Sequence, residues 1–310
     1  MTCIALAGSV GRTLLAECPS ALLQFFYTPD ACALRLVCRE FQAAVAEHPW
    51  DDKSTVLRGG FAQWRGCFPR ARSAVVYKVS DADFAHFAGL RELDMSVCDE
   101  GVTDAAFAHL RGIQTLHMSG CAQSTLTDAA FANLAGIKRL DMSFCGQDTI
   151  TDAAFAHLAG IRSLDMSCCN QDTITDAAFE PLRGIRELNV SGCTQLTDAA
   201  FAHLKGIRVL YMDFCRQEGI SDAAFSHLRG VHTLGMQGCN QETISDAALA
   251  HLAGIQSLDV SACTQDALTG SAFASLAGVQ SLLMVGCNET QIAAAVAAGL
   301  PVRWEDEEEN

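Results

Sequence analysis

The sequence contains no long apolar run and no obvious leader segment. No stretch reaches the roughly 20 apolar residues that a membrane-spanning helix needs, so we expect no membrane association. The N-terminal segment MTCIALAGSVGRTLL has no basic residue ahead of its short apolar part, and a secretory signal normally begins with one. These absences predict a soluble intracellular protein.

Basic residues and recognisable catalytic motifs are also scarce. Lys and Arg number 21 against 36 Asp and Glu, a net charge of −15, whereas nucleic-acid binding needs a basic face to neutralise phosphates. The sequence has no glycine-rich phosphate loop and no motif that sets a nucleophile beside a base. We therefore expect no nucleic-acid partner, no cofactor and no enzymatic activity.

What the sequence does contain is a repeat that starts near Val79. One apolar residue follows a recurring glycine in each of nine units, at a spacing of 24 residues with one interval of 23 and one of 22. These positions are Leu90, Ile113, Ile137, Ile161, Ile185, Ile207, Val231, Ile255 and Val279. Units of 20 to 29 residues are typical of leucine-rich repeats, each too small to bury its own apolar face.

Each unit combines two apolar periods. In IKRLDMSF, Leu140 and Met142 alternate as in a strand, whereas in TDAAFANLAG, Phe131 and Leu134 lie three apart as in a short helix. A Thr or Ser residue can N-cap that helix, as Thr127 and Ser221 do in their units, and a glycine such as Gly136 can end it. Each unit is therefore predicted to run strand, loop, helix, turn.

The repeats resemble the cysteine-containing leucine-rich repeats through LxxLDMSxC followed by ITDAAFxxL. The resemblance implies an α/β solenoid with a curved parallel sheet inside and short helices outside. We assign residues 79–298 to this array, as nine units plus a truncated cap repeat that begins around Val75–Tyr77, and 299–310 to a C-terminal cap strand and acidic tail.

Nine of the 15 cysteines occupy a single repeat position. They are Cys98, Cys121, Cys145, Cys169, Cys193, Cys215, Cys239, Cys263 and Cys287. Because the repeat accounts for their spacing and a buried thiol behaves as a small hydrophobe with a weak donor, we interpret them as core residues rather than metal ligands. Reduced thiols indicate the cytoplasm or nucleus. Cys168 lies off this position, and we expect it to be exposed on the concave face.

The N-terminal region resembles a second family. Residues 1–14 are unassigned, 51–78 are expected to be a packed connector and the start of an N-terminal cap, and 15–50 resemble the F-box through LLxFF, LRLVCREF and a closing His-Pro-Trp. The resemblance implies contact with the adaptor subunit of SCF-type cullin ubiquitin ligases, through Pro19, Leu22, Leu23, Phe26, Leu34 and Val37. The alternative is a helical cap that shields the first repeat.

The variable positions of the array are the candidates for partner binding. Since side chains alternate along a strand, residues between the buried Leu and Met positions should face the concave side. Large or charged residues gather there in the middle units: His117, Arg139, Asp141, Phe144, Asp165, Asn189, Tyr211, Asp213 and Phe214.

Asp141 and Asp165 should be neighbours on adjacent strands, which is unfavourable without a compensating charge. Compensation could come from Lys138, Arg139, Arg162 and Arg186 or from a basic partner. A calcium site needs more oxygen ligands than the surroundings offer, and an open sheet lacks the burial that would make two carboxylates act as acid and base.

Two hypotheses follow. In the first, the chain is a monomeric substrate receptor of an SCF-type ubiquitin ligase that holds a protein substrate on its concave face. In the second, it is a free-standing acidic scaffold or inhibitor that binds a basic protein, and its N-terminal helices are only a cap.

Overall fold

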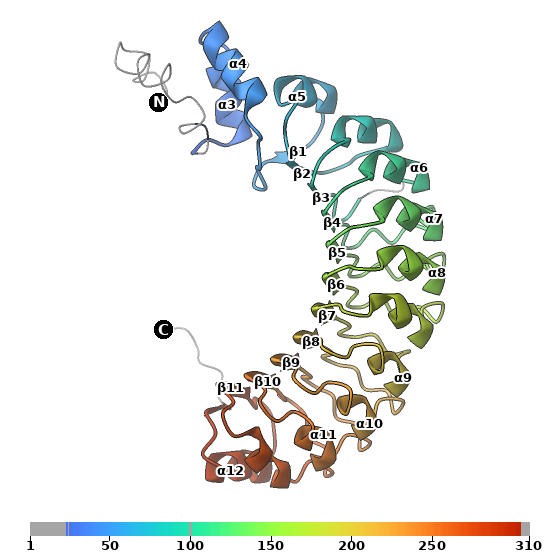
Figure 1. The fold of residues 1–310 in the computed structure, drawn as a ribbon, viewed down its shortest axis with the longest axis vertical. Helices are drawn as coiled ribbons and strands as arrows, with labels where there is room; N and C mark the ends of the chain where they lie inside the picture. The colour runs from blue at the N-terminus through green and yellow to red at the C-terminus, as the bar shows by residue number, and fades with distance from the viewer. Residues whose placement is uncertain (1–22, 24, 99–100, 305–310) are drawn as a thin grey trace.

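The computed structural model describes residues 23, 25–98 and 101–304. Over these residues the chain forms an open arc whose inner side is a single parallel sheet and whose outer side carries short helices (Figure 1). The sheet has twelve strands in sequence order. Each strand therefore pairs with the strands of the preceding and following repeats.

Most of the strands and helices are short. The strands are β1 Val56–Leu57, β2 Ser73–Val76, β3 Glu92–Asp94, β4 Thr115–His117, β5 Arg139–Asp141, β6 Ser163–Asp165, β7 Glu187–Asn189, β8 Val209–Tyr211, β9 Thr233–Gly235, β10 Ser257–Asp259, β11 Ser281–Leu283 and β12 Val302–Arg303. The α-helices are α3 Thr28–Leu34, α4 Arg39–Glu47, α5 Phe61–Cys67, α6 Asp104–Phe107, α7 Asp128–Phe131, α8 Asp152–Phe155, α9 Asp198–Phe201, α10 Asp222–Phe225, α11 Asp246–Ala250 and α12 Glu289–Ala297. The 3₁₀ helices are η2 Asp81–Phe87, η3 Ala108–Leu110, η4 Ala132–Leu134, η5 Ala156–Leu158, η6 Asp176–Leu182 and η7 Ser271–Leu276.

The strands show the predicted two-residue alternation. Leu140 and Met142 are 2% and 0% exposed, while Asp141 between them is only partly buried. The register pairs Leu140 with Leu164 and Asp141 with Asp165, so identical positions stack from unit to unit. The stacked apolar residues form one continuous core between the sheet and the helices.

The predicted helix signals are confirmed. The Thr127 hydroxyl accepts a hydrogen bond from the backbone N–H of Ala129 at 3.2 Å, and Ser221 caps α10 in the same way. One α turn and one 3₁₀ turn follow, burying Phe131 and Leu134. Gly136 then has a φ of +88°, a left-handed conformation that glycine adopts without steric cost.

The aspartate after each cap has a role that the sequence pattern did not reveal. Asp128 accepts from the backbone N–H of Thr151 at 2.7 Å and from its hydroxyl at 2.8 Å, so it joins its own helix start to the next. The same pair of bonds recurs along the array, from Asp81 with Thr103 to Asp222 with Ser245. This ladder fastens the outer edge of the solenoid as the strands fasten its inner side.

The repeated cysteines lie in the core, as the repeat position predicts. Cys145 is fully buried, and its thiol donates to the backbone carbonyl of Met118 in the preceding unit at 3.3 Å. Burial raises the pKa of Cys169 and of Cys215 to about 12, so these thiols stay protonated. Within the described ranges, no group of three or more His, Cys, Asp or Glu side chains is placed to hold a metal ion.

The sheet begins earlier than the repeat pattern predicts. Val56–Leu57 pairs with β2 in parallel, so part of the expected connector is itself a repeat unit; its two-residue strand carries no copy of the motif. Phe61, Trp64 and Phe68 of the connector are buried in the core. Phe61 lies against Phe87, and Phe68 against Trp50, with ring centroids 5.3 and 5.4 Å apart. At the other end, α12 and β12 follow β11. Across the described parts of the chain, no helix is long and apolar enough to cross a bilayer.

Candidate protein-binding face

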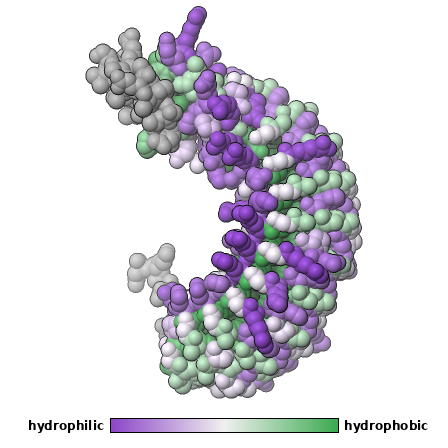
Figure 2. Space-filling view, in the orientation of Figure 1, coloured by the Kyte–Doolittle hydropathy of each residue, from purple (hydrophilic) through white to green (hydrophobic). Residues whose placement is uncertain are grey.

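The register of the sheet brings the predicted concave residues together. The last residues of β4 to β8 pair in sequence, from His117 with Asp141 to Asn189 with Tyr211. Asp213, Phe144 and Phe214 come just after their strands. All nine predicted residues therefore lie on five consecutive strands or directly beyond them, on the inner side of the arc (Figure 1). Figure 2 shows hydrophilic side chains along this inner side, in contrast to the apolar core behind it.

Hydrogen bonds from serine residues hold the carboxylates of Asp141 and Asp165 in place. One oxygen of Asp141 accepts from the backbone N–H and the hydroxyl of Ser143 at 3.0 and 2.7 Å, and Asp165 is held in the same way by Ser167. The second oxygen of each carboxylate is left for other groups. Their neighbours therefore decide how much charge remains for a partner.

Of the two sources of compensation considered, the nearby arginine and lysine side chains form no close ion pair with these carboxylates in the described chain. Four close charge pairs exist among the described residues, and none involves Lys138, Arg139, Arg162 or Arg186. The second oxygen of Asp141 instead lies 3.7 Å from Nδ1 of His117.

Asp165 obtains a neutral neighbour. The side-chain amide of Asn189 donates to its second oxygen at 3.0 Å, while the carbonyl oxygen of the same amide accepts from the backbone N–H of Ser191. The negative charge of Asp165 is therefore oriented but not neutralised. Asp94 and Asp259 each accept a hydrogen bond from the backbone N–H of the serine two residues further on, as Asp165 does.

Ionisation along the column follows from these contacts. The hydrogen bond to Asp141 raises the pKa of His117, and the carboxylates of Asp94 and Glu92 add to this against a smaller effect of burial. Burial alone would raise the pKa of Asp141, but hydrogen bonds from His117 and Ser143 outweigh it and lower that pKa. Burial raises the pKa of Asp213, in spite of a hydrogen bond from the backbone N–H of Gln237.

Two aromatic rings lie against the unit that follows them. A Cβ atom added to Gly235 would come 2.7 Å from Cδ1 of Tyr211, and one added to Gly238 would come 2.8 Å from Cδ1 of Phe214. The two glycines therefore make room for the two rings, and we call Tyr211 and Phe214 on this glycine surface the aromatic shelf. The rings are 41% and 47% exposed.

An arginine completes the shelf. The Arg216 guanidinium lies 5.5 Å from the centroid of the Phe214 ring, and its Nε donates to the carbonyl of Gly238 at 3.0 Å. Sequence reasoning missed Arg216, Gly235 and Gly238. The signal in the sequence was that the last residue of β9 is Gly235, where the other units of the array carry larger residues, and that Gly238 follows in the same unit.

The position just after the strand has a left-handed backbone in several units of the array. Phe144, Cys168 and Phe214 have φ of +58°, +58° and +59°, while the equivalent Gly192 and Gly238 have +73° and +66°. This conformation costs a non-glycine residue roughly 1–2 kcal/mol. Phe144 adopts it although its side chain is 59% exposed.

Cys168 lies at one of these left-handed positions and is exposed, as predicted. Its sulfur is within 3.2 Å of where a Cβ on Gly192 would lie, so it occupies the space beside that glycine as the Phe214 ring does at Gly238.

The predicted adaptor contacts do not form one exposed surface. Leu23 and Leu34 are 1% and 7% exposed and belong to the core cluster, Phe26 packs against that cluster, and Val37 is 59% exposed. Pro19 and Leu22 lie outside the described residues. Leu23 and Leu34 therefore belong to the same buried core as the repeats. The neighbouring apolar residue Leu36, at 89% exposed, was not singled out from the sequence.

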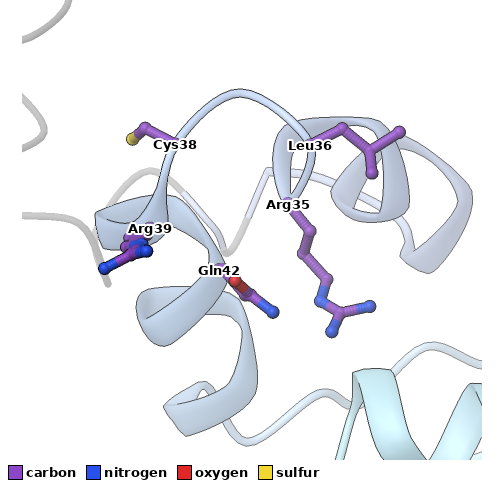
Figure 3. A pocket seen from close by; sticks show the side chains of 5 residues that line it. All are labelled: Arg35, Leu36, Cys38, Arg39 and Gln42. Carbon is purple, nitrogen blue, oxygen red and sulfur yellow. The ribbon is translucent and has the colours of Figure 1, made fainter.

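Two depressions lie in the N-terminal part of the described chain. One, of about 380 Å³, is lined by Arg35, Leu36, Cys38, Arg39 and Gln42. Figure 3 shows the Arg35 and Gln42 side chains entering the space between α3 and α4 while Leu36 points away from it. The other, of about 350 Å³, includes Leu23, Phe26, His48 and Trp50 in its lining. The first two of these residues are predicted adaptor contacts.

Comparisons with known proteins support the fold. No protein-family model matches the sequence, and no curated protein matches it. Among solved structures, a chain of the Toll–Spatzle complex from Drosophila superposes with a TM-score of 0.51 at 12% identity, over 74% of this chain and 38% of that one. Internalin C2 from Listeria monocytogenes gives 0.48 at 22% identity, over 67% of this chain and 84% of its own.

A third match is TLR13 in its complex with ssRNA13, with a TM-score of 0.49 at 16% identity, over 76% of this chain and 38% of that one. The present chain thus spans well under half the length of the Toll and TLR13 chains. The parallel sheet, the repeat period and the Toll superposition define the fold as an α/β leucine-rich-repeat solenoid. The predicted fold class is confirmed.

Proposed function

We propose that this protein is a binding module that holds a basic protein partner on its concave face, between β4 and β9. The observation that carries the proposal is a face that holds exposed aromatic residues, namely the aromatic shelf and Phe144, together with the carboxylates of Asp141 and Asp165. These two carboxylates pair with no Lys or Arg of the described chain. Exposed aromatic residues and matching charge are the usual ingredients of binding hot spots and partner choice.

The energetics of Phe144 and Phe214 support a role outside the fold. Both residues have left-handed backbones, and glycine serves at the same position in other units without loss of the fold. Keeping a half-exposed phenylalanine there costs backbone strain for an incomplete gain in burial. A partner that covered these rings would recover the missing burial.

The carboxylates of the concave face indicate the sign of the partner's charge. Asp141 and Asp165 stack on adjacent strands, where like charges repel. Serine hydrogen bonds fix both carboxylates, so they are already oriented before a partner arrives. Lysine or arginine side chains of a partner would relieve the repulsion, with an apolar residue seated on the shelf.

Peptide display tests this proposal directly. A random peptide library is panned on the wild-type chain and then on a Phe144→Ser, Phe214→Ser variant. A His157→Ser, His227→Ser variant is the control, because both histidines are exposed on the outer side of the array, His157 in η5 and His227 just after α10. We expect peptides rich in Lys or Arg with a bulky apolar residue, lost with the first variant and kept with the second. Enrichment of acidic peptides, or equal retention by both variants, would refute the proposal.

A second candidate function is the recruitment of a substrate to an SCF-type ubiquitin ligase. It rests on the F-box resemblance of residues 15–50 and on the exposed apolar residues Leu36 and Val37 between α3 and α4. The burial of Leu23 and Leu34 favours instead the simpler cap. In that case the chain is a scaffold or inhibitor of its basic partner.

Co-expression with an SCF adaptor subunit separates these two functions. Val37→Asp is the informative variant because Val37 is exposed, whereas a charge at Leu34 would disrupt the core. Co-elution on size exclusion that Val37→Asp abolishes, and that a charge on the outer helices leaves intact, would support the ligase role. Absence of co-elution with a folded wild-type chain would leave the scaffold role.

A further inference from the structure

A row of basic residues runs along the edge of the sheet where the strands begin. Backbone hydrogen bonds place its members side by side: each N–H donates to the carbonyl of the equivalent residue in the preceding unit at 2.7–3.0 Å. The basic column, as we call it, consists of Arg91, Lys138, Arg162, Arg186 and Arg208, with Gln114 between the first two. Four of its five cations precede consecutive strands.

None of these cations has a carboxylate partner in the described part of the chain. The close charge pairs there involve Lys53, His117 and Arg183 as cations, and among the described residues no side-chain hydrogen bond is made by any cation of the basic column. The arginine members are exposed and Lys138 is partly buried. Stacking like charges on neighbouring strands is unfavourable.

The isolation of the basic column is unexpected in so acidic a chain. Acidic residues outnumber basic ones by 15, yet only Glu92 and Glu187 lie next to the column in sequence. Both begin their strands, so they alternate toward the concave face, and Glu92 is paired with Lys53 at 2.6 Å. The edge therefore presents an unneutralised positive strip beside the acidic concave column.

We infer that the basic column binds an extended acidic segment of a partner protein. Adjacent strands are about 4.8 Å apart, so the five steps from Arg91 to Arg208 span about 24 Å. Side chains on one face of an extended peptide recur about every 6.8 Å. Four acidic residues at alternate positions cover about 20 Å, which matches the length of the basic column.

The chemistry around the column favours a polypeptide over nucleic acid. Single-stranded nucleic acids are held by aromatic rings on which bases stack as well as by cations, and the basic column contains no aromatic residue. Its acidic surroundings would also repel a long phosphate backbone as it left the strip. A short acidic peptide avoids both problems.

The test uses the full chain and a labelled peptide, Glu-Ser-Glu-Ser-Glu-Ser-Glu, with fluorescence anisotropy at low and physiological salt. The variant is Arg162→Gln, Arg186→Gln. Its matched control is Arg70→Gln, Arg229→Gln, which removes the same charge from exposed arginines outside the basic column that also make no side-chain hydrogen bond or ion pair in the described chain. A peptide with Gln in place of Glu and a dT15 oligonucleotide serve as competing probes.

We expect the column variant to weaken binding of the acidic peptide about fivefold, as the loss of two exposed ion pairs implies, and the control by less than about twofold. The Phe144→Ser, Phe214→Ser variant should bind it normally, because the concave face takes the opposite charge. Equal weakening by variant and control, no binding at low salt, or binding of dT15 but not the peptide would overturn the inference.

Discussion

The aromatic shelf predicts how Gly235→Ala changes the stability of the protein. The sign of this change depends on whether the Tyr211 ring is present. Gly235 lies in β9 and has no left-handed φ, so alanine there meets no backbone strain. In open space such a replacement stabilises a protein by about 0.4–1 kcal/mol, because alanine restricts the unfolded chain. Here, however, the new Cβ would come 2.7 Å from Cδ1 of Tyr211 and 3.1 Å from Oδ1 of Asp213.

The clash should more than cancel the gain. Overpacking usually costs about 1–3 kcal/mol, and because Tyr211 is 41% exposed its ring can tilt outward, which places the cost at the lower end. We expect Gly235→Ala to destabilise the wild-type chain by about 0.5–1 kcal/mol. In a Tyr211→Ala background the same change should be neutral or stabilising.

Urea unfolding of the four proteins in this double-mutant cycle gives the coupling energy, which we expect to exceed about 1 kcal/mol. Fluorescence and circular dichroism transitions should coincide and their slopes should agree among the variants, so that midpoints report stability. The reasoning fails if Gly235→Ala changes stability equally, and with the same sign, in both backgrounds. That result would mean that the Tyr211 ring does not lie on Gly235.

Three further predictions concern His117 on the concave face, the neighbouring cysteines Cys168 and Cys169, and the hydrogen-bond ladder between the outer helices. Contact with Asp141 raises the pKa of His117 above its ordinary value of 6.5. The stability that this contact contributes is therefore complete below pH 6.5 and is lost as the pH rises through the raised pKa. Urea midpoints of the wild type and His117→Gln should converge as the pH rises above about 6.5, and a constant difference would contradict this. Under native conditions iodoacetamide should label the exposed Cys168 but not its neighbour Cys169, whose pKa burial raises to about 12; equal labelling by peptide mass spectrometry would show that the core opens there. Asp152→Ala removes two hydrogen bonds from Thr175 and should lower the free energy of unfolding by about 1–2 kcal/mol. A change below about 0.3 kcal/mol would show that the hydrogen-bond ladder is not a source of stability.

The repeat made most of the solenoid predictable from sequence. A fixed period forces equal positions to stack, so the burial of Leu140 and Met142, the cap at Thr127 and the buried cysteines all follow from one well-patterned unit. The neighbour relation of Asp141 and Asp165 follows in the same way. Where the motif is missing, as in Val56–Leu57, the period gives no information and the strand was not anticipated.

Features that depend on side-chain direction were harder to predict. The sequence shows which cations are near Asp141, but not that none of them forms a close ion pair with its carboxylate. It shows an apolar pattern at Leu23 and Leu34, which is equally compatible with a docking surface and with the core. The left-handed position of Phe144 was detectable only by comparison with glycines at the same place in other units, and Gly235 gained meaning once the Tyr211 ring was placed over it.

The most direct test of the concave binding face is a binding isotherm for one basic peptide recovered by display. Its dissociation constant is measured by calorimetry for the wild type, Phe214→Ser and Asp165→Asn at two salt concentrations. We predict that each variant weakens binding about tenfold, as loss of a hot-spot residue or a charge-assisted contact would, and that Asp165→Asn reduces the salt dependence. Unchanged affinity in both variants would contradict the assignment of this face as the binding site.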